Sequence, residues 1–178
     1  MKKMKTVFVI DRATRRATDE VQVQWVMDGE GWATIKFDGT CCKIEDGVLF
    51  RRYDAKRGKT PPEGFVPCEP TPDAVTGHWP GWVEVDPTDP ACKWHVEAFG
   101  GDGFVDGTYE LVGPKVQGNR YGLARHELWR HGESVVTVPR DKEAMVRWLE
   151  ENEQEGLVFH HPDGRMAKIR RKDFAIRW

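Results

Sequence analysis

Residues 31–40, GWATIKFDGT, predict a β-strand over residues 31–37 that ends at a tight turn on Asp38-Gly39. The turn would leave Lys36 at the end of the strand, with its amine at the rim of a sheet. A lysine is protonated at neutral pH and becomes a nucleophile only after it loses that proton. Because burial or neighbouring cations such as Lys168 would favour this loss, Lys36 is a candidate nucleophile. A lysine that merely precedes a hairpin turn is the alternative interpretation.

Apolar and alternating runs predict further strands on both sides of this stretch, over residues 7–10, 21–27, 41–44, 48–53, 108–112, 126–131, 156–160 and 166–170. Glu45-Asp46-Gly47 and the HPDG sequence at 161–164 predict two hairpins. An amphipathic helix is expected over residues 141–152, and the Pro- and Gly-rich residues 60–92 are expected to be irregular. These elements predict an α+β fold with mostly antiparallel sheets and few helices, in a single domain over residues 1–178.

The charge distribution is uneven although the formal net charge is only −2. Residues 51–59 and 165–178 are basic, and residues 141–155 are acidic. Basic clusters of this kind either bind phosphates or are simply solvated, and charge alone does not separate the two. No apolar run approaches a membrane helix, the N-terminus does not match a signal peptide, and neither cysteine nor histidine spacing matches a zinc motif. We therefore expect a cytoplasmic protein with reduced thiols.

The hairpin on HPDG brings charged residues together. If its loop has an even length, odd positions on the first strand share a face with even positions on the second. Glu155 would then lie on the same face as Lys168 and Arg170, where an acid and two bases suit a metal-bound triphosphate. Leu157 and Phe159 would share this face and form an apolar wall of a base pocket. A surface cross-strand ion pair is the alternative.

Four short motifs occur in order along the chain: KxDG at Lys36, ELxG at Glu110, EGxV at Glu155 and KxR at Lys168-Ile-Arg170. This set resembles motifs I, III, IV and V of the covalent nucleotidyltransferases. The segments YELVGPKVQGNRYGL, EGLVFHHPDG and AKIRRKDF resemble a family of small ATP-dependent RNA ligases. The resemblance spans about residues 32–174 and implies a ligase-type adenylation domain. We expect no OB domain, because little sequence follows the last motif.

The resemblance implies a function. Lys36 would form lysyl-AMP with ATP, and the AMP would activate an RNA 5′-phosphate for attack by an RNA 3′-hydroxyl. Its implied catalytic residues are Lys36, Lys168 and Arg170. Its implied nucleotide-binding residues also include Arg52, Glu110, Trp129 and Glu155, and Glu155 would hold Mg²⁺ or Mn²⁺. The implied partner is RNA with 5′-phosphate and 3′-hydroxyl ends, with no membrane and no protein partner.

Several choices stay open at this level. Tyr121 is as good a candidate as Trp129 for stacking on adenine, and Arg171 and Lys172 either grip RNA phosphates or form a solvated tail. The sequence departs from the family pattern at Ile35, where many relatives have an acid, and at Arg170, where lysine is common. A non-catalytic RNA-binding module on a ligase-like fold, or an adenylating enzyme with a non-RNA acceptor, are the competing functions.

Overall fold

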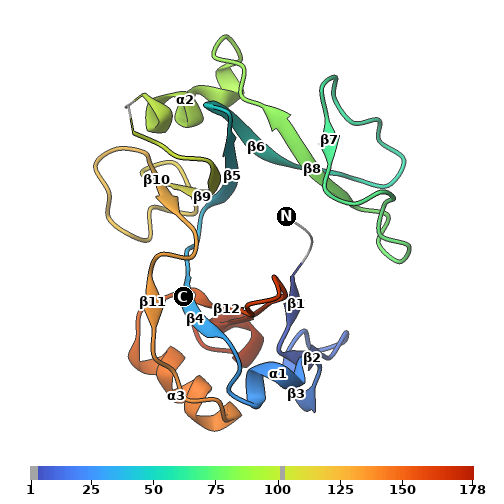
Figure 1. Ribbon diagram of the computed structural model, residues 1–178, viewed down its shortest axis with the longest axis vertical. Coiled ribbons are helices and arrows are strands. Elements are labelled where there is room, and N and C mark those ends of the chain that lie inside the picture. The colour runs from blue at the N-terminus through green and yellow to red at the C-terminus, as the bar shows by residue number, and fades with distance from the viewer. Residues whose placement is uncertain (1–3, 101–102) are drawn as a thin grey trace. The chain divides into compact units, whose positions relative to one another are not determined.

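The computed structural model describes residues 4–100 and 103–178, and these form two compact units (Figure 1). Unit 1 contains Asp38–His131, and unit 2 contains Met4–Phe37 together with Gly132–Trp178. The chain therefore leaves unit 2 after Phe37 and returns to it at Gly132. The expectation of a single domain over residues 1–178 stays a prediction.

Unit 2 is built on a five-stranded sheet. Its strand order is β1 (Lys5–Thr6), β13 (Met166–Arg170), β12 (Gly156–His160), β4 (Trp32–Lys36) and β11 (Val135–Val136). Only the pairing of β1 with β13 is parallel among these neighbours. The other elements of the unit are the hairpin β2 (Phe8–Ile10) and β3 (Ala17–Val21), the helices α1 (Gln24–Met27) and α3 (Lys142–Glu151), and the 3₁₀ turn η2 (Arg171–Phe174).

One face of this sheet carries the core of unit 2. Leu157 and Phe159 of β12 are fully buried there, together with Met145 and Leu149 of α3. The two helix residues lie four positions apart, on one side of α3, which is why the helix can cover the sheet. Asp141 caps the helix by accepting a hydrogen bond from the Ala144 amide at 2.8 Å. The helix expected over residues 141–152 is confirmed.

The strand expected over residues 21–27 is wrong for most of its length. β3 ends at Val21, and α1 begins at Gln24. Trp25 and Val26 are neighbours in sequence and both are buried, which the alternation of a strand would not allow but a helical turn does. The alternation of apolar and polar residues over 21–27 therefore does not correspond to the two faces of a strand.

Unit 1 contains a six-stranded antiparallel sheet. Its order is β10 (Glu127–Arg130), β9 (Gly107–Val112), β5 (Thr40–Glu45), β6 (Val48–Ala55), β8 (Trp79–Glu84) and β7 (Val66–Pro67). Figure 1 shows β6 and β8 side by side, and the helix α2 (Lys93–Phe99) follows the 3₁₀ turn η1 (Pro90–Cys92). Asp46 and Gly47 both have positive φ, as a two-residue hairpin turn requires, so the hairpin expected there is confirmed.

The irregular segment expected over residues 60–92 is wrong at β8. This strand pairs with β6 over six residues, although its sequence contains Pro80 and Gly81. Gly81 is needed because a Cβ there would lie 2.3 Å from the ring of Phe65. The glycine therefore marks a close packing contact within a strand and not a loop.

The α+β class with mostly antiparallel sheets is confirmed. Across residues 4–100 and 103–178, no helix combines the length and the apolar character needed to cross a membrane.

Candidate active site

Three cations lie on one face of the sheet in unit 2. Lys36, Gly156 and Arg170 are paired in a single row across β4, β12 and β13. Val158 pairs with Lys168 in the next row on the same side. Residues that pair directly across antiparallel strands point to the same side of a sheet. We call the side that carries Lys36, Lys168 and Arg170 the cation face.

This register corrects one expectation from the sequence. His160 pairs with Met166, so the hairpin loop contains residues 161–165 and has an odd length. Leu157 and Phe159 therefore point away from Lys168 into the core, and they do not form a wall beside it. Val158 is the apolar residue of β12 that lies on the cation face.

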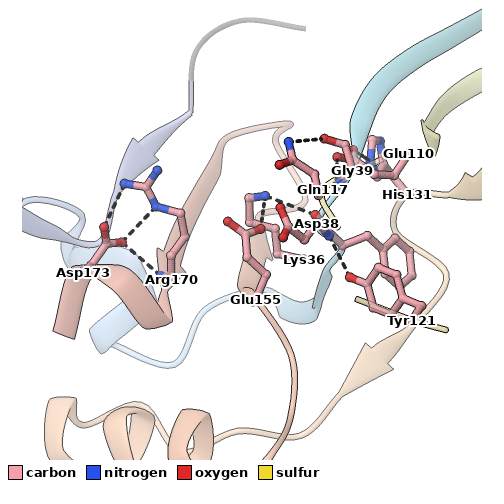
Figure 2. A network of polar contacts seen from close by, with 11 residues as sticks. Lys36, Asp38, Gly39, Glu110, Gln117, Tyr121, His131, Glu155, Arg170 and Asp173 are labelled. Carbon is pink, nitrogen blue, oxygen red and sulfur yellow. Dashed lines mark hydrogen bonds and ion pairs between the residues drawn. The ribbon is translucent and has the colours of Figure 1, made fainter. Parts of the chain in front are cut away.

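Glu155 reaches the cation face from a position just before β12. Its carboxylate forms an ion pair with the Lys36 amine, as Figure 2 shows. The same amine donates to the Phe37 carbonyl at 3.2 Å. The Arg171 amide donates to the Glu155 carbonyl at 2.9 Å, which fixes the backbone at the open end of the hairpin. Glu155 and Lys36 are thus in contact although 119 residues separate them.

The cation face perturbs Lys168. The pKa of this lysine is lowered to about 8, mainly by burial and then by the positive charges of Arg170 and Lys36, while Glu155 and Asp173 act in the opposite direction. Lys168 can therefore lose its proton at a mildly alkaline pH. A bound anion would stabilise the protonated form, which makes this face suited to phosphate groups.

Arg170 is held by a buried acid. Its Nε and its backbone amide donate to Asp173 Oδ2 at 3.2 and 3.0 Å, and its Nη2 donates to Oδ1 at 2.8 Å (Figure 2). Asp173 is only 3% exposed. The planar guanidinium thus has a fixed orientation, which a lysine could not reproduce. The sequence analysis did not single out Asp173, although its place three residues after Arg170 in the 3₁₀ turn was a possible signal.

The tight turn expected at Asp38-Gly39 is wrong, because β4 and β5 belong to different sheets. The glycine is required for another reason: a Cβ on Gly39 would lie 2.2 Å from the Leu111 carbonyl oxygen. The Gly39 amide donates to Glu110 Oε1 at 2.9 Å, and Gln117 Nε2 donates to the Gly39 carbonyl at 3.5 Å. The KxDG and ELxG motifs thus meet within unit 1 through Gly39 and Glu110 (Figure 2).

The other expected nucleotide-binding residues share one face of the sheet in unit 1. Trp129 pairs directly with Glu110, and Glu110 pairs directly with Cys41. Because Cys42 pairs with Arg51, the neighbouring Arg52 points to the same side as Cys41. The sheet therefore brings Arg52, Glu110 and Trp129 to a common surface.

The two candidate stacking aromatics are neighbours in unit 1. The rings of Tyr121 and Trp129 are 4.7 Å apart and tilted by 53°. Trp129 Nε1 donates to Glu127 Oε2 at 2.9 Å, and the Asp38 amide donates to the Tyr121 hydroxyl at 2.7 Å. Which of the two rings contacts a base stays a prediction.

Arg52 borders a cavity of about 570 Å³ that the sequence analysis did not find. The cavity lies between β6 and the loop before β8, and its lining includes Asp54, Glu69, Asp73 and His78. Arg52 Nη1 donates to Cys68 Sγ at 3.2 Å, and its guanidinium lies 5.1 Å from the ring of Trp82. These contacts fix the Arg52 side chain along the sheet.

The fold and the cation face define an α+β protein whose unit 2 carries a candidate site for a phosphate-bearing ligand. No family model matches the chain. A protein named RNA ligase 1 from Danio rerio is 31% identical in an alignment 221 positions long, which covers 82% of this chain and 68% of that protein. Proteins of the same name from Rattus norvegicus and Pongo abelii are 26% identical, with 82% of this chain covered and 68% and 67% of theirs. The chain therefore belongs to the RNA ligase 1 family.

Proposed function

We propose that this protein is an ATP-dependent RNA ligase that joins 5′-phosphate and 3′-hydroxyl RNA ends through a lysyl-AMP intermediate. The observation that carries the proposal is the placement of Lys36 on the cation face, in one row with Arg170 and beside Lys168. Membership of a family whose proteins are named RNA ligase 1 supports RNA as the substrate.

In the first step, the Lys36 amine attacks the α-phosphorus of ATP. A P–N bond forms, the bond from the α-phosphorus to the bridging oxygen breaks, and pyrophosphate leaves with the electron pair. An ammonium group has no lone pair for attack, so Lys36 must give up a proton to solvent as its contact with Glu155 is released. Lys168 and Arg170 stabilise the negative charge that develops on the phosphate oxygens.

The donor set of this face suits Mg²⁺ or Mn²⁺. Both ions prefer oxygen ligands, and Mg²⁺ is commonly held by one or two carboxylates together with substrate phosphates and water. Glu155 supplies such a carboxylate, which is 13% exposed and already lies against Lys36. Bound there, the metal would neutralise phosphate charge during displacement.

The next two steps transfer the nucleotide and seal the RNA. An oxygen of the RNA 5′-phosphate attacks the phosphorus of lysyl-AMP, the P–N bond breaks, and the amine of Lys36 takes up a proton. The RNA 3′-hydroxyl then attacks the activated 5′-phosphate, loses its proton, and expels AMP. Arg52 and Glu110 would contact the nucleotide sugar, and Trp129 would stack on the base.

The test is intact-mass spectrometry after incubation with ATP and Mg²⁺. We expect an adduct of about 329 Da, the mass of an AMP group, on Lys36. Lys36→Arg keeps the charge and should abolish the adduct. Lys142 is a half-buried lysine of the same unit that forms an ion pair with Asp19, and Lys142→Arg should retain the adduct. An adduct that persists in Lys36→Arg would overturn the assignment.

The competing functions give different results in the same experiment. Salt-sensitive RNA binding without an adduct in Mg²⁺ or Mn²⁺ would indicate a non-catalytic RNA-binding module. An adduct that is not transferred to 5′-phosphorylated RNA, but is transferred to another acceptor, would indicate a different adenylating enzyme. GTP in place of ATP tests the choice of nucleotide.

A further inference from the structure

Three neighbouring strands of unit 1 bring a thiol, a carboxylate and an imidazole together. Cys41 of β5 pairs directly with Glu110 of β9, and His131 follows the last residue of β10. One ligand atom of each side chain lies within 4.8 Å of the other two. These residues are far apart in sequence, so no spacing motif could reveal the group.

Hydrogen bonds outside the group orient two of the three side chains. Glu110 Oε1 accepts from the Gly39 amide at 2.9 Å, which leaves Oε2 directed at His131 Nε2, 2.8 Å away. His131 Nδ1 lies 3.1 Å from Thr108 Oγ1. Such outer contacts typically fix the ring and carboxylate orientations of metal ligands. The group therefore has both the donor atoms of a metal site and the contacts that hold them.

The electrostatics of the group favour a cation. Glu110 is only 8% exposed, so its carboxylate lies in a largely dry environment. Burial, followed by the negative charge of Glu110, raises the pKa of the Cys41 thiol to about 12. A divalent ion between these side chains would balance the buried negative charge of Glu110. It would also stabilise the Cys41 thiolate and so lower the pKa of that thiol.

We propose that Cys41 Sγ, Glu110 Oε2 and His131 Nε2 bind a zinc ion, with a fourth position open to water or another ligand. Mixed sulfur, nitrogen and oxygen ligands suit zinc and not magnesium, which prefers oxygen alone. This site goes beyond the ligase function and stands on unit 1 alone. The alternative is a hydrogen-bonded glutamate–histidine pair next to a structural thiol.

Binding changes the protonation of the ligands in a defined way. The Cys41 thiol loses its proton to solvent as the Zn–S bond forms. His131 would bind zinc through Nε2 in the tautomer that carries its proton on Nδ1, which can donate to Thr108 Oγ1. Zinc binding should therefore release at least one proton per ion at neutral pH, and its affinity should increase with pH.

The test uses metal-free full-length protein under reducing conditions, titrated with Co²⁺ and then with Zn²⁺. We expect one Co²⁺ per chain, a near-ultraviolet band from thiolate-to-cobalt charge transfer, and displacement by Zn²⁺, which binds more tightly. The band should disappear in Cys41→Ser and persist in Cys68→Ser. Absence of the band in the wild-type protein, or its persistence in Cys41→Ser, would overturn the proposal.

Two further variants guard against misfolding as an explanation. His131→Gln should weaken zinc binding strongly, and Thr108→Val, which removes only the contact to Nδ1, should weaken it about tenfold. Both should keep the circular dichroism spectrum of the wild type. If a folded Thr108→Val and a folded His131→Gln both bind zinc as the wild type does, His131 is not a ligand and the site is wrong. The adduct on Lys36 is measured in separate samples without zinc, so failure of this site and failure of the ligase function are distinguishable.

Discussion

Lys36 and Arg170 lie in one row of the sheet, on the two strands that flank Gly156. Their strands are two positions apart, which corresponds to about 10 Å between backbones. Gly156 adds no side chain of its own to this row, so it leaves room for a phosphate group between the two strands that carry the cations. The absence of a side chain at position 156 is thus part of the proposed phosphate site.

Gly156→Ala should destabilise unit 2. A Cβ at this position would lie 2.1 Å from the Ile169 carbonyl oxygen, which belongs to the backbone of β13 and cannot move without breaking strand pairing. We expect a loss of about 2 kcal/mol or more in the free energy of unfolding, measured in urea. Gly100→Ala is the control, since its nearest contact is at 3.4 Å and it should change little. Equal stability of the two variants would contradict the register described here.

The affinity for ATP should fall as the pH rises through about 8. Lys168 binds phosphate only when protonated, and its pKa of about 8 means that this charge is lost in the alkaline range. Binding of a non-hydrolysable ATP analogue should weaken about tenfold between about pH 7.5 and 9.5, because one charged hydrogen bond is lost. In Lys168→Arg the charge persists and the pH dependence should flatten. A similar fall in both proteins would show that another group titrates.

Replacing Asp173, the acid that holds Arg170, should lower the free energy of unfolding. Asp173→Asn keeps the shape of the side chain but leaves the Arg170 cation without its charged partner, at a cost of about 2–4 kcal/mol. Urea denaturation gives the value. Asp163→Asn removes an acid from an exposed pair with Arg165 and should have no comparable effect. The prediction fails if Asp173→Asn is as stable as Asp163→Asn.

Because Leu157 of β12 points into the core, a substitution there should change the stability of the protein without changing adduct formation. Leu157→Ala should cost about 2–5 kcal/mol, because Leu157 is fully buried in the core. Its rate of adduct formation per folded molecule should stay that of the wild type, since Leu157 points away from Lys36. If Leu157 instead lined the nucleotide site, the Michaelis constant for ATP would rise in the folded protein.

Zinc should slow the formation of the AMP adduct if both proposals hold. The carboxylate of Glu110 would be shared between zinc and the nucleotide sugar, so occupancy by the metal should raise the Michaelis constant for ATP. For each protein, the rate of adduct formation with zinc is divided by the rate without zinc. That ratio should be close to one in Cys41→Ser and well below one in the wild type. An equal ratio in the two proteins would separate the zinc site from the nucleotide site.

Much of unit 2 could be predicted from the sequence, because its strands are short, regular and bounded by turn residues. The two strands around HPDG agree with β12 and β13 to the residue. Their relative orientation could not be predicted, since it depends on whether the loop contains an even or an odd number of residues. Adding Arg165 to the four residues of HPDG is enough to move Leu157 and Phe159 to the opposite face.

The features that the sequence analysis predicted wrongly contain glycine or proline, and a glycine can mark either a turn or a close packing contact. Pro80 and Gly81 usually indicate a loop, yet here the glycine makes room for the Phe65 ring inside β8. Gly39 indicated a turn, yet it makes room for the Leu111 carbonyl oxygen. In both cases the neighbour that requires a glycine is distant in sequence, so only the folded chain identifies it. The group of Cys41, Glu110 and His131 could not be predicted either, because its three residues are also distant in sequence.

The chain leaves unit 2 after Phe37 and re-enters it at Gly132. These two points are close together within unit 2, because the Ile35 amide donates to the Ser134 carbonyl at 2.9 Å. Everything from Asp38 to His131 is therefore inserted between two strands that already touch. A protein engineer could replace that insertion with a short turn, joining β4 to β11 as a hairpin. The resulting miniature would keep Lys36, Glu155, Lys168 and Arg170 on one continuous scaffold, and it could serve as a starting point for grafting other nucleotide-recognition modules.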